Sequence, residues 1–171
     1  MDDLVSLQPA RESDLPVLDR LTGDPEATGE FAWYGWLAPP WRRRWDENRL
    51  LGEDGGTLMV AHDGQRVGFV QWRRRQTART SYCWNVGIAL LPQARGRGYG
   101  SHAQQLLARY LFAHTQAHRL EAVTEVDNIA EQRALEKAGF IREGIMRGCG
   151  WRDGAWRDGV TYSLLRTDPM P

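Results

Sequence analysis

The sequence has few cysteines and no long apolar run. Its 171 residues include only Cys83 and Cys149, which form no CxxC pair and have no histidine partners nearby, so neither a disulfide scaffold nor a zinc site is expected. No stretch approaches the roughly 18 apolar residues that a membrane-spanning helix needs. The start, MDDLVSLQPARESD, is acidic and lacks the apolar run of a secretory signal. These absences favour a reduced cytoplasmic protein without a metal site or a membrane contact.

The sequence also lacks an excess of charge of either sign. Lysine and arginine together number 22, as do aspartate and glutamate, and the formal net charge is zero. This balance argues against a protein that binds nucleic acid by neutralising phosphates in bulk. Hydrophobic residues make up 42% of the chain and charged residues 26%, as in ordinary globular proteins. We therefore expect one domain over residues 1–171, long enough to bury a sizeable core.

Strand patterns dominate what is present. Two Asp-Gly pairs, which begin at Asp63 and Asp153, each lie between alternating apolar segments, and this is the strongest short-range signal for a β-hairpin. The expected strands are 4–10, the two arms within 57–75, 81–91, 119–126 and the two arms of the tail after Gly139. The fold class that these patterns favour is α/β of the α+β type, with a central, mostly antiparallel mixed sheet flanked by helices.

Helical periodicity is found in shorter stretches. The third expected helix carries apolar residues at i, i+3, i+4, i+7 and i+8, from Ala103 to Leu111. Gly139 is expected to end the fourth helix in a left-handed conformation. The expected helices follow the cap residue Ser13, lie near 41–51, follow the glycines at 96–100, and run from 128 to 138. Residues 22–56 are otherwise irregular by pattern.

The most informative stretch is PQARGRGYGSHAQQLL, residues 92–107. Three glycines alternate with Arg95, Arg97 and Tyr99 and then lead directly into a helix. Glycines let backbone N–H groups approach a ligand closely, and the first turn of a helix has unpaired N–H groups and a partial positive charge. Together they predict a site for phosphate or pyrophosphate, with the two arginines adding charge at its rim. The alternative is a tight strand-to-helix turn with two solvated arginines.

Two kinds of phosphate ligand fit this loop. GYGSHA, residues 98–103, matches the GxGxxA pattern of dinucleotide-binding proteins, and Glu121, Glu125 and Asp127 lie near the spacing of a ribose-binding acid. However, a Rossmann domain needs successive strand–helix units that make a parallel sheet. The strands before this loop read as hairpins, so NAD is the less favoured ligand.

From about residue 57 to 166 the chain resembles the GNAT superfamily of acetyl-CoA-dependent N-acetyltransferases. The family's phosphate loop, Q/R-x-x-G-x-G/A, is matched by Arg95-x-x-Gly98-x-Gly100. The later stretch VDNIAEQRALEKAGFIREG resembles the branch that includes the ribosomal-protein N-terminal (alanine) acetyltransferases. The resemblance implies a GNAT-like domain that transfers an acetyl group directly from acetyl-CoA to a primary amine. A protein or peptide N-terminus is the leading acceptor and a small-molecule amine the second. The alternative is a non-catalytic acyl-CoA-binding or sensing module of the same fold.

The resemblance also implies a set of coenzyme-binding residues. The main chain of one strand would pair with the pantetheine arm as if with an added strand, and backbone amides of the loop would hold the pyrophosphate. Asn128 lies where relatives bond to the pantetheine, although it can equally cap a helix, with Glu131 completing a capping box. The implied residues are Ile88, Ala89 and Leu90 for the strand, Arg95, Gly96, Arg97, Gly98, Gly100 and Ser101 for the loop, and Asn128.

The catalytic residues depart from the family's pattern. Many relatives have a tyrosine acid where this chain has Leu135, and others have a glutamate base where it reads Trp84-Asn85. Glu131 is therefore the catalytic candidate, as an acid or a base acting through water, and the capping box is its structural alternative.

The acceptor side is expected in residues 22–56, which hold a dense group of aromatic residues. In relatives this region forms part of the acceptor pocket, although the same rings could simply pack the segment onto the sheet. The candidate acceptor residues are Trp33, Tyr34 and Trp36, together with Trp84 and Asn85. The acceptor itself and the oligomeric state, a homodimer included, stay open.

Overall fold

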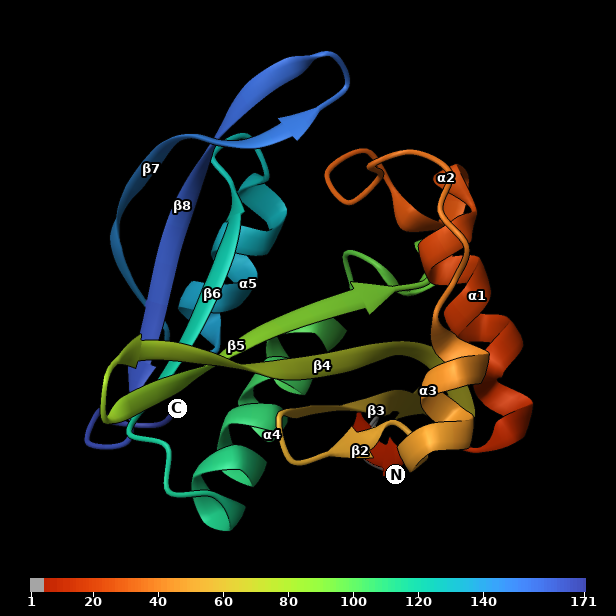
Figure 1. Ribbon diagram of the computed structural model, residues 1–171, viewed down its shortest axis with the longest axis horizontal. Coiled ribbons are helices and arrows are strands. Elements are labelled where there is room, and N and C mark those ends of the chain that lie inside the picture. Colours follow the sequence, from red (N-terminus) through yellow and green to blue (C-terminus); the bar gives the residue numbers. More distant parts are fainter. Residues whose placement is uncertain (1–4) are drawn as a thin grey trace.

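The computed structural model describes residues 5–171, which form one eight-stranded mixed sheet with helices on both of its faces (Figure 1). The strands are β1 (Ser6–Pro9), β2 (Leu51–Gly52), β3 (Gly55–His62), β4 (Gln65–Ala78), β5 (Ser81–Leu90), β6 (Arg119–Glu125), β7 (Ile141–Arg152) and β8 (Ala155–Leu165). The helices are α1 (Leu15–Gly23), α2 (Pro25–Thr28), α3 (Trp41–Asn48), α4 (Tyr99–His114) and α5 (Ile129–Lys137). The strand order is β1-β3-β4-β5-β6-β8-β7, and β2 pairs with β3.

The pairing of the strands confirms the predicted fold class. β5 and β6 pair in parallel, and the other neighbouring strands of the described chain pair antiparallel. A parallel pair needs a long crossover, and here α4 provides it. No helix among residues 5–171 has the length and apolarity needed to cross a lipid bilayer.

Alternate residues of the central strands face two separate cores. On β3, Leu58 and Val60 belong to the larger core, which includes residues of α4 and α5, whereas Met59 between them belongs to the core that includes α1 and α3. On β4, Val70 and Phe69 are divided in the same way. Because successive side chains of a strand point to opposite faces, α4 and α5 cover one face of the sheet and α1 and α3 cover the other.

Both Asp-Gly turns form as predicted. Asp63 and Gly64 join β3 to β4 with φ of 49° and 72°, and Asp153 and Gly154 join β7 to β8 with φ of 51° and 71°. Positive φ at both central residues gives a turn whose twist matches that of the strands it connects. The second turn places the tip of the β7–β8 hairpin near the functional site described below.

Other local predictions were wrong in detail. Asp14 rather than Ser13 is the N-cap of α1, because a short 3-10 turn precedes the helix. Helix α3 ends at Asn48 and not near 51, since Arg49 adopts a left-handed φ of 55°. The irregular region also contains α2, which Asp24 caps by accepting a hydrogen bond from the Glu26 N–H at 2.9 Å. Of the predicted strand 4–10, residues 6–9 form β1, and residue 4 lies outside the described residues.

The buried face of helix α4 overlaps the face that its apolar residues suggest but does not coincide with it. Ala103, Leu107 and Leu111 are buried as predicted, whereas Tyr110 at the edge of the apolar stripe is exposed. Gln104 lies on the buried face and is only 4% exposed. A polar side chain therefore occupies a core position beside α5.

The sheet opens between β5 and β6. Their parallel pairing is confined to Trp84 with Leu120 and Asn85 with Glu121. Beyond Asn85 the two strands diverge (Figure 1), while residues 86–90 of β5 remain paired with β4 on their other side. The backbone of residues 86–90 therefore has an open edge toward β6.

Candidate active site

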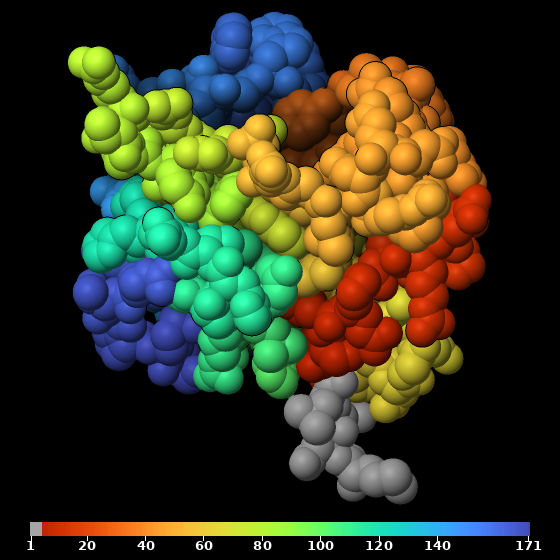
Figure 2. Space-filling view, turned by 60° about the horizontal axis from the view of Figure 1, so that its bottom comes forward, coloured from red at the N-terminus to blue at the C-terminus, as the bar shows by residue number. Residues whose placement is uncertain are grey.

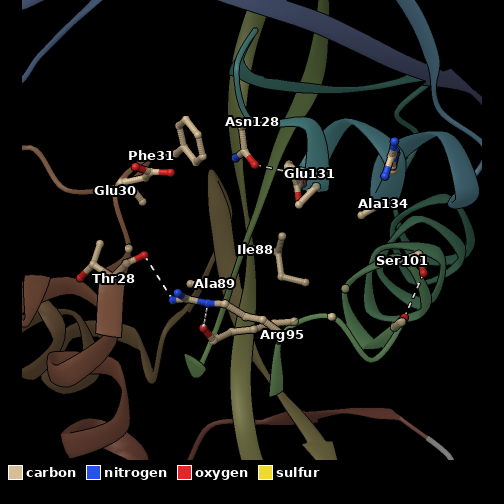
Figure 3. A pocket seen from close by; sticks show the side chains of 18 of the residues that line it. Thr28, Glu30, Phe31, Ile88, Ala89, Arg95, Ser101, Asn128, Glu131 and Ala134 are labelled. Carbon is tan, nitrogen blue, oxygen red and sulfur yellow. Dashed lines mark hydrogen bonds between the residues drawn. The ribbon is translucent and has the colours of Figure 1, made fainter. Parts of the chain in front are cut away.

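A cavity of about 660 Å³ lies beside the open edge of β5. Its walls come from four segments: residues 28–32 before α3, residues 88–90 of β5, the glycine loop 95–101, and one face of α5 with the residue before it. Figure 3 shows Thr28, Glu30 and Phe31 on one side and Asn128 and Glu131 on the other, with Ile88 between them. The segments that the sequence singled out are thus brought together around one space.

Nearly all of the predicted coenzyme-binding residues line this cavity. Arg97 is the exception, since it is exposed and lies outside the lining. The predicted residues that line the cavity are Ile88, Ala89, Leu90, Arg95, Gly96, Gly98, Gly100, Ser101 and Asn128. The predicted catalytic residue Glu131 lines it as well.

The glycine loop needs its glycines for backbone conformation. Gly96 and Gly98 have φ of 72° and 81°, which side-chain-bearing residues rarely adopt. A Cβ at either position would meet no atom within 4 Å, so the space over the loop is open. Gly98 is the N-cap of the 16-residue helix α4, and its carbonyl accepts the Ser101 hydroxyl at 2.9 Å. The loop therefore presents open space at the positive end of a long helix, as an anion site requires.

The side chain of Arg95 crosses the cavity. Its Nε donates to the Leu90 carbonyl at 3.0 Å, and its Nη2 donates to the carbonyls of Ala27 and Thr28. Figure 3 shows the guanidinium reaching from the glycine loop to the segment at Thr28. Burial lowers the pKa of Arg95 from its usual value. The predicted rim charge is thus bonded to backbone carbonyls and ties the end of β5 to the segment that follows α2.

Asn128 is the N-cap of α5, as predicted. Its Oδ1 accepts from the Glu131 N–H at 3.3 Å, and its Nδ2 donates to the Thr124 hydroxyl at 3.0 Å. The second half of the expected capping box is absent, because the Asn128 N–H donates to the Glu125 carbonyl instead. The carboxyl of Glu131 turns toward α4, where its Oε1 accepts from Gln104 Nε2 at 3.1 Å. The cap therefore uses the backbone N–H of Glu131, and its carboxyl takes no part in capping.

Among the described residues that line the cavity, Glu131 is the titratable group whose pKa is shifted most. Burial raises the pKa of its carboxyl from 4.5 to about 7, against the hydrogen bond from Gln104, which lowers it. A carboxyl with such a pKa is present in both protonation states at neutral pH, so it can accept and return a proton.

Trp84 and Asn85, which were predicted to contact the acceptor, lie outside the lining of this cavity. Trp84 is 5% exposed in the larger core, where its indole N–H donates to the Thr115 hydroxyl at 3.0 Å. Asn85 bonds to Arg73 and to the Glu121 carbonyl. Both residues precede the point at which β5 and β6 diverge, so β6 still covers them. Leu135, in place of the family's tyrosine, is also buried.

A second cavity, of about 580 Å³, adjoins the first. Trp33 and Tyr34 line it from one side, and residues 151–153 at the tip of the β7–β8 hairpin line it from the other. Glu30 lines both cavities. Trp36 is 79% exposed and packs edge-on against Trp33 with ring centroids 5.0 Å apart. In Figure 2 the surface is hollowed between the orange segment and the blue C-terminal strands.

One hairpin residue of the second cavity, Arg152, forms a partly buried ion pair with Glu125 of β6. Arg152 Nη2 donates to Glu125 Oε2 at 2.8 Å, and the guanidinium lies 5.6 Å from the ring centre of Phe31. The hydrogen bond from Arg152 lowers the pKa of Glu125, and burial raises the pKa of Tyr34. Sequence reasoning missed residues 151–153 as site residues. The Asp-Gly turn was a clear signal for the hairpin, but not for what its tip would approach.

Residues 5–171 contain no group of three or more His, Cys, Asp or Glu side chains placed to hold a metal ion. The site consists of a glycine loop, an open strand edge, a carboxyl with a raised pKa and an adjoining aromatic cavity. Comparisons with known proteins bear on this combination.

In sequence, residues 5–141 match the family described as "Acetyltransferase (GNAT) domain". YjcK of Bacillus subtilis, named as a probable N-acetyltransferase, is 31% identical over 113 residues, which cover 65% of this chain and 61% of YjcK. The match to YnaD, an N-acetyltransferase of the same organism that is uncharacterized by name, spans 51% of that protein. The chain therefore spans only about half to three-fifths of these relatives.

In structure, a spermidine N-acetyltransferase from Vibrio cholerae, in complex with CoA and spermine, matches with a TM-score of 0.80 at 15% identity over 98% of both chains. A ribosomal-protein-alanine N-acetyltransferase from Brucella melitensis matches with a TM-score of 0.74 at 24% identity, over 95% of this chain and 99% of that one. Likeness at these identities concerns the fold. The family follows from the match over residues 5–141: the chain belongs to the GNAT acetyltransferases.

Proposed function

We propose that this chain, as a single domain over residues 1–171, is an N-acetyltransferase that moves an acetyl group from acetyl-CoA to a primary amine. Membership of the GNAT family supports the reaction class. The observation that carries the proposal is the open edge of β5 over residues 86–90, which runs beside the glycine loop and one cavity. An extended chain that ends in a pyrophosphate fits this combination.

The residues around the first cavity fit acetyl-CoA by their chemistry. The backbone groups of residues 88–90 that point away from β4 lie at the open edge, where an extended amide-bearing arm can pair with them, as in the addition of a strand to a sheet edge; the Leu90 carbonyl there already accepts from Arg95. The amides near Gly96 and Gly98 and the positive end of α4 suit the pyrophosphate. Asn128, whose side chain also caps α5, lines the cavity opposite β5.

The chemistry needs a neutral amine and a route for one proton. Acetyl-CoA supplies the acetyl group as a thioester. Glu131, with a pKa of about 7, accepts the proton that the attacking amine loses, directly or through water, and returns it to the departing sulfur. Backbone N–H groups of β5 near residue 88 stabilise the negative charge on the carbonyl oxygen. One carboxyl thereby serves first as base and then as acid.

The second cavity is the proposed acceptor side. Trp33, Tyr34 and the exposed Trp36 form an aromatic wall and rim that can hold the residues beside the reacting amine. Glu30 lines both cavities, so an amine that enters by the second cavity meets a carboxylate before it reaches the first.

The leading acceptor is the α-amine of a protein or peptide. Removing the proton of an α-amine with a pKa near ~8 costs about 1.4 kcal/mol at pH 7, compared with about 4.6 kcal/mol for a lysine amine of pKa ~10.4. A weak base such as Glu131 suits the smaller cost. The name of the Brucella melitensis neighbour supports this acceptor, while the spermidine enzyme keeps a small amine as the second candidate.

The test begins with calorimetric titration of acetyl-CoA, CoA and NAD into the purified protein. We expect micromolar binding of acetyl-CoA and CoA and none of NAD. A panel of N-terminal peptides and polyamines is then screened for thiol release. Binding without turnover of any amine would favour a non-catalytic acyl-CoA-binding module, for which the absence of a tyrosine at Leu135 and of a carboxylate at Trp84-Asn85 argues. Absence of binding would remove the proposal.

A further inference from the structure

A glutamine lies on the core-facing side of α4, where an apolar residue is the rule. Gln104 is 4% exposed, and its helix neighbours on that face, Ala103 and Leu107, belong to the larger core. Burying a primary amide lowers stability unless it is hydrogen-bonded. Its position therefore calls for a polar partner.

Glu131 is a hydrogen-bond partner of that amide. Nε2 of Gln104 donates to Oε1 of Glu131 at 3.1 Å, between α4 and α5. We infer that Gln104 is a positioning residue for Glu131: it fixes Oε1, so that Oε2 is the oxygen that gains and loses the proton. The consequence for turnover rests on the proposed function, whereas the effect on the carboxyl itself does not.

The direction of the effect follows from the charge of the acceptor. A hydrogen bond donated to a carboxylate stabilises the ionised form, and accordingly the bond from Gln104 lowers the pKa of Glu131 while burial raises it. Gln104 thus increases the fraction of the Glu131 carboxyl that is ionised at neutral pH. It does so without adding a charge to the cavity.

Among the described residues, the charged side chains around the cavity do not replace the Gln104 amide as the partner of Glu131. The charged residues that line the cavity together with Glu131 are Glu30 from residues 28–32, Arg95 from the glycine loop, and Arg133 and Lys137 from α5 itself; β5 and α4 contribute no charged side chain to the lining. Among the described residues, Glu131 takes part in none of the ion pairs. The hydrogen bond from Gln104 is therefore the contact to change.

The chain offers a matched control one residue away. Gln105 also bonds from α4 to α5, but its Nε2 donates to the Lys137 carbonyl at 2.9 Å. Gln105→Met removes a helix–helix hydrogen bond and leaves the one to Glu131 intact. Gln104→Met removes the bond to Glu131 and keeps a long, unbranched side chain.

The experiment titrates the Glu131 carboxyl directly. Protein labelled with ¹³C at the glutamate carboxyl carbons is followed by NMR between pH 4 and 9, and the Glu131 signal is identified by its loss in Glu131→Gln. In Gln104→Met we expect the midpoint to rise by about 1 pH unit, and in Gln105→Met no change. Gln104→Glu keeps the shape of the side chain and covers the case in which Gln104→Met does not fold. Its second carboxyl is expected to raise the midpoint still more.

A second readout separates this inference from the proposed function. In the proposed function, kcat/KM calculated for the neutral form of the amine falls at acidic pH as Glu131 becomes protonated; we call this fall the acid limb. The midpoint pH of the acid limb should rise in Gln104→Met by the same amount as the NMR midpoint. An unchanged NMR midpoint in both Gln104 variants would overturn the inference and make Gln104 a structural residue. If the NMR midpoint moves and the acid limb does not, Gln104 tunes Glu131 as inferred, and the proton-transfer role of Glu131 fails instead.

Discussion

Arg95 and Gly29 are close neighbours in the wall of the first cavity. A Cβ at position 29 would come within 3.0 Å of Arg95 Nη1, and Gly29 has a φ of 84°. The backbone conformation therefore favours glycine at this position, and a Cβ would in addition crowd the Arg95 guanidinium. The contact joins the glycine loop to the segment that also lines the aromatic cavity.

Gly29→Ala is expected to lower the free energy of unfolding by about 1–3 kcal/mol, because alanine is strained at this φ and also contacts Arg95. Urea denaturation measures the change. In an Arg95→Ala background the steric part disappears, so the same substitution should lower stability less. Equal losses in the two backgrounds would show that the contact has no energetic weight.

Gly98→Glu should weaken acetyl-CoA binding by more than about 100-fold, because it places a bulky anion where the pyrophosphate is proposed to lie. Calorimetric titration measures the affinity. Gly64→Glu is the control, since Gly64 has a similar φ of 72° and equally open surroundings but lies in the β3–β4 turn. It should have a similar effect on stability and none on binding. Unchanged affinity in Gly98→Glu would contradict the proposal that the glycine loop binds the pyrophosphate.

Glu131→Gln should lower kcat and remove the acid limb near pH 7, while making the protein more stable at neutral pH. Burial raises the pKa of Glu131 from 4.5 to about 7, so the folded state binds this proton more tightly than the unfolded state. Relative to the variant, the wild type therefore loses stability as the pH rises from about 4.5 to 7, by up to about 3 kcal/mol. Urea titrations at pH 4, 5.5 and 7.5 measure the difference. A constant difference across this range would contradict the raised pKa.

Trp33→Ala should raise KM for the acceptor several-fold and leave the affinity for acetyl-CoA unchanged, because Trp33 lines only the second cavity. Steady-state kinetics and calorimetry give the two quantities. Trp45→Ala is the control, since Trp45 stacks on Arg49 and lines neither cavity. A Trp33 variant that changes only the melting temperature, as the control is expected to do, would assign Trp33 to packing.

The turns, the glycine loop and the helix cap were predicted correctly because each depends on residues that are close together in the sequence. The Asp63-Gly64 and Asp153-Gly154 turns need positive φ at two adjacent positions, and an Asp-Gly pair is typical of such turns. The glycine loop and the Asn128 cap are equally local. The strand and helix patterns were enough to predict the fold class, whereas the residues expected to line the first cavity came from the resemblance to the GNAT superfamily.

Contacts between distant segments escaped prediction. Gln104 and Glu131 are 27 residues apart, and the apolar stripe of α4 suggested a face that does not include Gln104. The capping box looked sufficient to explain Glu131, so nothing pointed to a second partner. Likewise Trp84 precedes the divergence of β5 and β6 and Ile88 follows it. Only the register of the parallel pair distinguishes a core residue from a cavity residue on the same strand.

The short parallel pairing of β5 with β6 divides the sheet into two half-sheets, β1–β5 and β6–β8, held directly by the backbone at only two residue pairs. If acetyl-CoA lies along residues 86–90 as proposed, it completes the interrupted sheet from outside the chain. The donor is then a structural part of the folded protein as well as its substrate. The concentration of acetyl-CoA should therefore determine how cooperatively the two half-sheets unfold. Amide hydrogen exchange across β5 and β6 would report the fraction of the protein that has acetyl-CoA bound.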